Sequence, residues 1–446
     1  MLGETRWLTA AILSFGRAPA KGCGLPFRLI LYNERITSII ALAVSRSKGC
    51  RDVLGTYVRK TWAPDPHLYA PARFRRGCSY DAFCPAPLSA RKFNIPGELA
   101  AAISDAESAI AGLNVEGART LAPLGRLLLR TESIASSKVE GLQMDARTLA
   151  CAEAKDEAGR KIGADAAEIL ASINSMELAV ERASEIRRFA VADLVDIHRA
   201  LLGRSAPKIA GSVRTVQNWI GGNDYNPCDA DFVPPPPEQL PALLDDVCAF
   251  CNEESLPPLV QAAIAHAQFE TIHPFEDGNG RTGRALVQVI LRRRGLAPAY
   301  VPPISVMLAR RKQPYIKGLV RYRDDDVDGW LTMFAEASAS AARLARLYLG
   351  RVRALQEDWR RQLGRIDPRS DAAAWSVIDI LPGSAVITVS AAIAGTGRSR
   401  PAAVHALDQL TQCGVLLPLT ESPRNRSWEA AGLLDLIVGL EEGEPL

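Results

Sequence analysis

The sequence predicts a mainly α-helical protein with a smaller C-terminal region in which short helices precede two short strands. Two observations support this fold class. Apolar residues recur at the helical period of about 3.6 residues over much of residues 97–362, and no series of alternating strands interrupts them. After residue 372 the helical segments become short, and two apolar strand-like segments flank a polar loop.

The composition is typical of a globular protein of two or three domains. The chain has 446 residues, of which 48% are apolar and 23% charged. The net charge is +3, but residues 1–92 contain 15 Lys/Arg against 5 Asp/Glu, a net +10 that leaves about −7 for the remainder. This distribution argues against bulk nucleic-acid binding. No apolar run reaches the roughly 18–20 residues of a membrane span, so we expect no membrane partner.

Nine cysteines are scattered along the chain, and this odd number favours a reducing, cytoplasmic environment over a disulfide framework. Cys248 and Cys251 form a CxxC pair, but no second pair and no well-spaced histidine accompanies it. We therefore interpret these two cysteines as small apolar residues on a helix.

The N-terminal part is expected to contain little regular structure before residue 96. Residues 1–55 show no clear period and predict a poorly ordered extension. Residues 62–97 are rich in proline, which forbids long helices and predicts an extended segment packed over a domain. From Pro96 onward the apolar residues follow a helical period, and a second helix over residues 121–141 stops at Gly141.

Glu140 lies in the last turn of that second helix, where a carboxylate meets the negative end of the helix dipole. Two interpretations stay open from the residues alone. Glu140 is either an exposed charge without a role or the partner of an arginine elsewhere in the chain.

The middle of the chain predicts helices over residues 163–182, 190–203, 238–252, 257–272 and 285–294, with two or three more within 313–362. Residues 209–222 predict a loop or a short β-hairpin with glycines at its turns. Phe232-Val-Pro-Pro-Pro-Pro237 predicts a stiff polyproline II stretch, which can form a rigid flap wall or a spacer.

The C-terminal region has the element order of a winged helix-turn-helix. Residues 372–381 and 388–394 predict helices, the second closed by Gly395, and Ser399 caps a third that stops at Gly414. Strands over 415–419 and 427–430 follow. DNA binding is possible, because arginines flank the third of these helices and the loop, but we favour docking of a partner or a second copy. The residues relevant to DNA are Arg398, Arg400, His405, Gln409, Arg424 and Arg426.

Residues 273–284, His-Pro-Phe-Glu-Asp-Gly-Asn-Gly-Arg-Thr-Gly-Arg, hold the candidate site. Residues 278–283 fit the dinucleotide pattern GxGxxG, which requires a preceding strand and an acidic residue about 20 positions later. A helical pattern precedes this stretch, and no acidic residue lies between Asp277 and Asp324. A dinucleotide-binding strand–turn–helix unit is therefore rejected.

The same residues suit phosphate chemistry. Glycines before a helix let backbone N–H groups face an anion, and Arg281 and Arg284 share one face of the first turn. Asp277 is a hard oxygen ligand suited to Mg²⁺, and His273 can accept a proton near neutral pH. Phe275 is interpreted as an apolar anchor. Together these residues predict a phosphoryl- or nucleotidyl-transfer site.

At this point the sequence resembles the Fic family, because residues 273–284 match its signature HxFx(D/E)GNGRxxR without a mismatch. The loop over 217–222 and the stretch over 232–237 are also similar to that family. Ser136-Ser-Lys-Val-Glu140-Gly141 matches the family's inhibitory motif (S/T)xxxE(G/N), placed N-terminal to the core.

The resemblance implies a Fic-fold helical bundle with a short β-hairpin flap and a winged-helix appendage. It implies four parts: an extension over 1–55, a Fic N-terminal region with the inhibitory helix over 56–160, a catalytic core over 161–365, and a winged helix-turn-helix over 366–446.

The implied activity is protein adenylylation, in which AMP passes from ATP with Mg²⁺ to a Tyr, Thr or Ser hydroxyl of a target protein or of the enzyme itself. His273 would be the general base and Asp277 the Mg²⁺ ligand. The resemblance assigns phosphate contacts to Gly278, Asn279, Gly280, Arg281 and Arg284, with the Asn279 side chain on the α-phosphate, Arg281 on β/γ oxygens and Arg284 on the γ-phosphate. Val233 and Pro234 would form the target-facing flap.

Glu140 would form a bidentate pair with Arg284 and so inhibit transfer. Three alternatives stay open: removal of AMP at the same site, transfer of another phosphate-containing group, and a winged-helix DNA-binding regulator. A homodimer is a possible assembly.

Overall fold

α-Helices dominate the computed structural model, which describes residues 55–117, 122–157, 159–419 and 426–444. The mainly helical fold class is therefore confirmed. The expected extension over 1–55 lies outside the described residues except for Gly55. Within them, no helix combines the length and apolar character that a membrane crossing requires.

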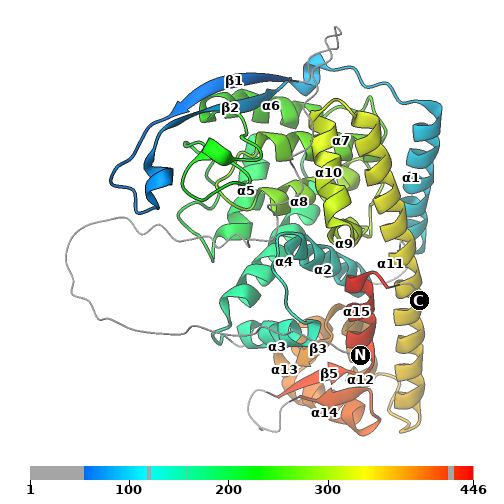
Figure 1. Cartoon of the computed structure of the whole chain (residues 1–446). Coiled ribbons are helices and arrows are strands. Elements are labelled where there is room, and N and C mark those ends of the chain that lie inside the picture. Colours follow the sequence, from blue (N-terminus) through cyan, green and yellow to red (C-terminus); the bar gives the residue numbers. More distant parts are fainter. Residues whose placement is uncertain (1–54, 118–121, 158, 420–425, 445–446) are drawn as a thin grey trace, which may run out of the picture.

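Eleven helices precede the C-terminal region in the described ranges: α1 Gly97–Gly117, α2 Ala122–Val139, α3 Ala146–Glu157, α4 Ala164–Ala183, α5 Val191–Leu202, α6 Leu240–Phe250, α7 Pro258–Ile272, α8 Asn279–Arg293, α9 Ile304–Arg310, α10 Lys312–Arg323 and α11 Val327–Gly364. Figure 1 shows α5 to α10 gathered in one half of the molecule, with α7 and α8 at its centre. Nearly every residue of α7 is buried, which explains its apolar character on all sides.

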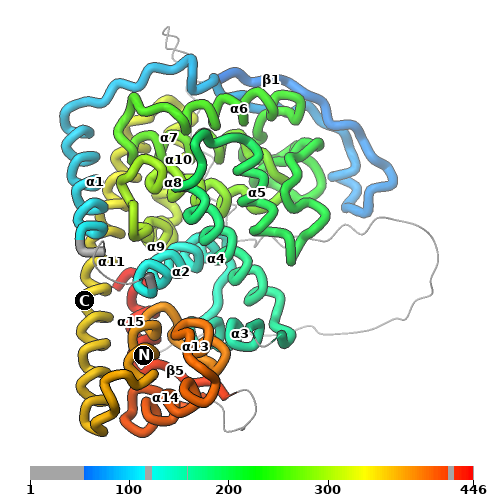
Figure 2. The backbone as a smooth tube through the Cα atoms, turned by 180° about the vertical axis from the view of Figure 1, so that it is seen from behind, coloured from blue at the N-terminus to red at the C-terminus, as the bar shows by residue number. Residues whose placement is uncertain are grey.

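Helix α11 joins the two halves of the molecule. Its 38 residues span roughly 57 Å at about 1.5 Å per residue, and both views show it running along one side of both halves (Figures 1 and 2). Near its start, Trp330 Nε1 donates to Ala263 O of α7 at 3.0 Å. Near its end, Trp359 Nε1 donates to Ala431 O of the C-terminal region at 3.1 Å. One helix is thus anchored in both halves.

The proline-rich N-terminal segment contains an antiparallel hairpin that the sequence analysis did not predict. Strand β1 (Gly55–Trp62) pairs with β2 (Cys78–Pro85) along their whole length. A disulfide joins Cys78 to Cys228 in the short helix η3 (Pro227–Asp229). The expectation of unpaired cysteines is therefore wrong for this pair. Cys248 and Cys251 are free and buried in and directly after α6, as interpreted.

Residues 209–222 form a loop with isolated bridges, which is the first of the two alternatives that the sequence left open. Val213 bridges to Phe275, and Ile220 bridges to Phe232. The prolines that follow Phe232 have no N–H group to extend the second bridge into a ladder. The flap is therefore an irregular segment held by side chains.

The C-terminal region contains α12 (Ala373–Ile380), β3 (Val386–Thr388), α13 (Val389–Thr396), α14 (Arg400–Gln412), β4 (Leu416–Pro418), β5 (Ser427–Ala430) and α15 (Leu433–Glu442). The strands form one antiparallel sheet in the order β3-β5-β4. Strand β3 was not predicted, and α13 ends at Gly397 with φ 65° and not at Gly395. The winged-helix assignment stays a prediction, and most of its expected loop lies outside the described residues.

Arg426 is engaged within the C-terminal region. Its guanidinium donates to Asp408 of α14 at 3.0 Å and lies 4.6 Å above the Trp428 ring. Arg426, one of the arginines on which the DNA-binding alternative depends, is therefore already paired within the protein. Arg424 lies outside the described residues.

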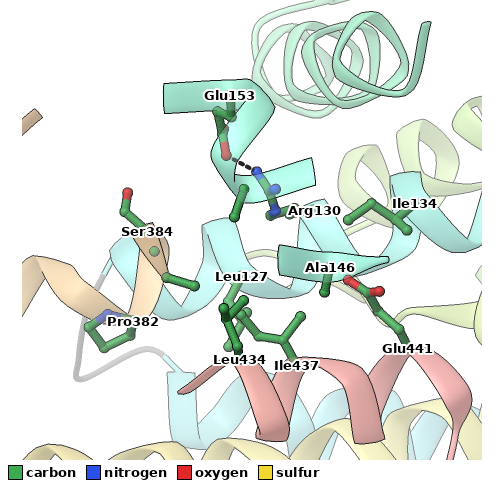
Figure 3. A pocket seen from close by; sticks show the side chains of 13 residues that line it. Leu127, Arg130, Ile134, Ala146, Glu153, Pro382, Ser384, Leu434, Ile437 and Glu441 are labelled. Carbon is green, nitrogen blue, oxygen red and sulfur yellow. Dashed lines mark hydrogen bonds and ion pairs between the residues drawn. The ribbon is translucent and has the colours of Figure 1, made fainter. Parts of the chain in front are cut away.

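Helix α2 lies between the two halves of the molecule. It packs against α4, α8 and α9 on one side and against α15 and the segment before β3 on the other. The contact between α2 and the C-terminal region is called the seam below. Figure 3 shows a recess along it, which is lined by Leu127 and Ile134 of α2 and by Leu434 and Ile437 of α15. Arg130 of α2 pairs with Glu153 of α3 at its edge. None of the predicted site residues lines this recess.

Candidate active site

A sharp bend between α7 and α8 gathers the residues of the signature. His273 ends α7 with φ 49°, and Gly278 precedes α8 with φ 76°, so left-handed residues stand at both ends of the bend. This backbone region is uncommon for a histidine, and the bend must therefore be held by its surroundings.

Asn279 holds the bend from inside. Its Oδ1 accepts from Phe275 N at 2.8 Å, and its Nδ2 donates to Phe275 O at 2.9 Å. The Phe275 ring is fully buried, which fits its interpretation as an anchor. Both groups of the Asn279 amide are thus occupied by main chain, and its contact with an α-phosphate stays a prediction.

His198 of α5 packs against the bend and forms a hydrogen bond to it. Its ring stacks on Phe275 with centroids 3.8 Å apart. Gly211 N donates to Nδ1 at 2.9 Å, so Nε2 carries the proton and donates to Asp277 O at 2.9 Å. Burial lowers its pKa and keeps this neutral form. Sequence reasoning missed His198, although a histidine on the inner face of the helix over 190–203 was a visible signal.

The main chain of His273 is fixed by the loop over residues 209–222. Arg214 Nε donates to His273 O at 2.9 Å, and Asn218 Nδ2 donates to the same oxygen at 3.4 Å. Arg214 also donates to Pro235 O at 2.6 Å, which ties the polyproline stretch to the bend. The sequence placed Arg214 in this loop without assigning it a role.

The His273 imidazole is neutral at neutral pH. Burial, reinforced by the Arg214 charge, lowers its pKa to about 4. Its Nδ1 has no hydrogen-bond partner among the described residues. A neutral imidazole with a free nitrogen can accept a proton.

Asp277 brings a carboxylate of the bend close to Arg281. Its Oδ1 accepts from Gly278 N at 2.6 Å, and its Oδ2 lies 3.8 Å from Arg281 Nη2. Its side chain is 34% exposed. No cluster of three metal-binding side chains occurs in the described ranges, so a metal here would take its other ligands from phosphates and water, as Mg²⁺ commonly does.

Arg284 is buried and bound by the end of α2. Its Nε donates to Ser136 Oγ at 2.8 Å, while Nη2 donates to Ser136 O at 2.9 Å and to Glu140 Oε1 at 2.7 Å. The pairing with Glu140 therefore uses one guanidinium nitrogen, and the expected bidentate pair is corrected. Ser136 takes the second position, because α2 brings its last turn alongside the arginine.

Glu140 lies directly over the first turn of α8. A Cβ atom added to Gly280 would lie 1.9 Å from Glu140 Oε1. Burial opposes ionisation of Glu140, but Arg284 outweighs it and lowers the pKa of the carboxyl. Glu140 in turn keeps the pKa of Arg284 above its usual value despite burial. A negative charge of the protein thus occupies the positive helix terminus.

A buried group of titratable residues lies behind Arg284 and was missed by the sequence analysis. Burial raises the pKa of Glu270 to about 8 and lowers that of His266 to about 3. His266 Nε2 is 2.8 Å from the Tyr315 hydroxyl. Helical periodicity placed both residues on α7 but did not show that they face the site.

The predicted flap residues are not presented to solvent. Val233 and Pro234 are buried. Val233 O accepts from Phe83 N of β2 at 2.9 Å, and Pro234 O accepts from Gln217 Nε2 at 2.9 Å. Target docking at these residues stays a prediction, and a strand added at Val233 would have to displace β2.

Comparison with known proteins covers the stretch that contains the bend. Residues 188–291 match the Fic/DOC family. Protein adenylyltransferase fic-1 of Caenorhabditis briggsae is 36% identical over 144 residues, which are 32% of this chain and 25% of that protein. Protein adenylyltransferase Fic of Nematostella vectensis is 31% identical over 156 residues, 31% of this chain and 33% of that protein. The chain thus spans about a quarter to a third of these curated relatives.

A solved structure of a Fic family protein from Desulfovibrio desulfuricans G20 aligns with 76% of this chain and 98% of its own, at 20% identity and a TM-score of 0.47. From the match over residues 188–291 and the curated relatives, the chain contains a Fic/DOC domain and is a distant relative of the Fic protein adenylyltransferases.

Proposed function

We propose that the protein is a protein adenylyltransferase whose resting state is inhibited by Glu140. The family match supports nucleotidyl transfer, and the distant relatives named protein adenylyltransferases support AMP as the transferred group. The bend supplies a base, a metal-binding carboxylate and two arginines in one place, which is the set of groups that such a reaction needs.

In the proposed reaction, a side-chain hydroxyl oxygen of a target protein attacks the α-phosphorus of ATP. A new oxygen–phosphorus bond forms, and the bond from the α-phosphorus to the bridging oxygen breaks. Pyrophosphate leaves with that electron pair, and the hydroxyl proton passes to His273. The depressed pKa of His273, about 4, keeps the imidazole available as an acceptor throughout the neutral range.

Arg281, Arg284 and the N-terminal N–H groups of α8 would hold the phosphates. All of them lie on the first turns of one helix beside His273. Asp277, with its partly exposed side chain, would hold a Mg²⁺ ion that neutralises phosphate charge. The α-phosphate is oriented for attack only when both arginines can bind phosphate oxygens of the nucleotide.

The inhibition follows from the position of Glu140. Its carboxylate covers Gly280 and accepts from Arg284. It therefore occupies the space that a γ-phosphate would need and neutralises the guanidinium charge that would bind it. This contact is the observation that carries the proposal.

The test is transfer of label from α-labelled ATP with Mg²⁺ by the full chain, both to itself and to proteins of a host lysate. Glu140→Gly should raise labelling by roughly tenfold or more, as expected for loss of a charge-assisted hydrogen bond that competes with substrate. Adding His273→Ala to this variant should abolish labelling. Lys138→Gly is the matched control, because it places glycine in the same turn without removing a partner of Arg284.

Labelling by Glu140→Gly no stronger than that by wild type and Lys138→Gly would contradict autoinhibition. Labelling that survives His273→Ala would contradict the assignment of the base.

The reverse reaction is a second candidate. Glu140 is ionised and its side chain is 27% exposed at the edge of the site, so it could orient a water molecule toward a modified side chain. Release of AMP from a pre-labelled target that is lost in Glu140→Ala would favour removal of AMP as the main activity.

A further inference from the structure

The other arginine of the signature is also paired with a carboxylate. Arg281 Nη1 donates to Glu168 Oε1 at 2.6 Å. Glu168 lies in the second turn of α4, and α4 packs against both α8 and α2. The two arginines that would meet the phosphates are therefore each bound by a glutamate from a different part of the chain.

Glu168 lies between Arg281 and solvent. The side chain of Arg281 is 4% exposed and that of Glu168 is 24% exposed. The pair of Arg284 and Glu140 has the same arrangement, at 3% and 27%. In both pairs the guanidinium is more deeply buried than the carboxylate that binds it.

The local charge also opposes nucleotide binding. Arg281 lies between the carboxylates of Glu168 and Asp277, the latter at 3.8 Å. One positive and two negative charges leave this corner of the site with a net charge of −1. A polyphosphate would meet repulsion here until Mg²⁺ covers Asp277 or Glu168 moves away.

We infer that Glu168 is a second inhibitory carboxylate, which competes with the β- and γ-phosphates of a nucleoside di- or triphosphate for Arg281. This inference rests on the proposed function. It implies that removal of Glu140 frees only Arg284, so that the Glu140→Gly variant is still partly inhibited.

Binding of Mg²⁺ with ATP, ADP or AMP to the full chain, measured by isothermal titration calorimetry, tests the inference without requiring transfer. In the Glu140→Gly background, adding Glu168→Gln should tighten ATP and ADP by roughly three- to tenfold, the range for loss of one competing charged pair. AMP affinity should not change, because AMP has no phosphate group that reaches Arg281. The KM for ATP should fall in parallel, with little change in kcat.

Glu177→Gln in the same background is the matched control. Glu177 lies on the same helix, its side chain is 25% exposed, and it pairs with Arg126 at 3.3 Å, away from the signature. This variant should leave all three affinities unchanged. Thermal unfolding of each variant checks that α4 remains folded.

Three results would count against the inference. Weaker ATP binding with Glu168→Gln would make Glu168 a support for Arg281, and unchanged ATP and ADP binding would give it no role. Equal tightening of AMP would show that the effect does not pass through Arg281. If Glu140→Gly itself binds no nucleotide, the proposed function fails, and the inference fails with it. If Glu140→Gly binds nucleotide but Glu168→Gln has none of the expected effects, only the inference fails.

Discussion

His266 and Glu270 lie one turn apart on α7, with Nδ1 and Oε1 separated by 3.9 Å. His266 is buried and Glu270 is largely buried, with its side chain 12% exposed. Desolvation makes each of them neutral at pH 7, because the pKa of the histidine falls to about 3 and that of the glutamate rises to about 8. Their contact is therefore not an ion pair. The Glu270 carboxyl near Arg284 is thus uncharged. If it were ionised, it would compete with Glu140 for the same guanidinium.

Glu270→Gln should change how stability depends on pH. Glu270 ionises near pH 4.5 when unfolded and near pH 8 when folded, so its contribution to stability is complete below pH 4.5 and is lost as the pH rises through 8. Glutamine stays neutral and avoids this loss. The difference in free energy of unfolding between variant and wild type, measured by urea denaturation, should therefore shift in favour of the variant by a few kcal/mol, roughly, between pH 5 and pH 8.

Glu181→Gln, at an exposed position, is the control for the same change of side chain. A Glu270→Gln difference that varies with pH no more than that of this control would show that the Glu270 carboxyl is already ionised in the folded protein.

At the scale of single residues, the sequence placed most of the predicted site residues in one short stretch, but it did not predict the contacts that hold them. His273, Asp277, Arg281 and Arg284 lie within twelve residues of the chain, so their proximity follows from one bend. Glu168 is separated by more than a hundred residues and looks like any charged residue on a helix surface. Its contact with Arg281 depends on the packing of α4 against α8, which the sequence does not predict.

At the scale of elements, helices with a strong apolar period were predictable and the N-terminal hairpin was not. The strands β1 and β2 are joined by a long connection in place of a short turn with a recognisable sequence. Only the end of β2 is buried, so the alternation of apolar and polar residues that identifies a strand is weak. The hairpin is held by contacts far away in the chain, above all the disulfide to Cys228.

The cysteine pairing can be checked by peptide mapping of the oxidised, unreduced protein. A cross-linked peptide containing Cys78 and Cys228 is expected. Cys248 and Cys251 should stay thiols despite their CxxC spacing, because burial raises the pKa of Cys248 to about 12 and that of Cys251 well above its usual value.

Cys228→Ser should then lower the free energy of unfolding by about 2–4 kcal/mol under oxidising conditions. The same substitution should have little effect once wild type has been reduced, which provides the control. Alkylation of both Cys78 and Cys228 before reduction would refute the pairing.

At the scale of the whole molecule, α2 links the C-terminal region to the site. Its apolar face meets Leu434 and Ile437 of α15 (Figure 3). Its C-terminal end brings Ser136 and Glu140 to Arg284. A salt bridge between Arg147 of α3 and Glu429 of β5 adds a second connection along the same seam. The sequence predicted α2 and a strand over 427–430 but neither α3 nor α15, and it did not predict these contacts, since an apolar helix face does not specify its partner.

Ile437→Ala should therefore weaken the inhibition as well as the fold. Ile437 is 5% exposed and packs along α2, whereas Ile378 of α12 is fully buried within the C-terminal region and does not line this seam. Either substitution to alanine should lower the free energy of unfolding by about 2–5 kcal/mol in urea titrations. Only Ile437→Ala removes support from the helix that positions Glu140, so only this variant should label itself from α-labelled ATP several times faster than wild type. Equal labelling by the two variants would show that loss of stability alone releases Glu140, and no increase in either would show that α2 holds its position without α15.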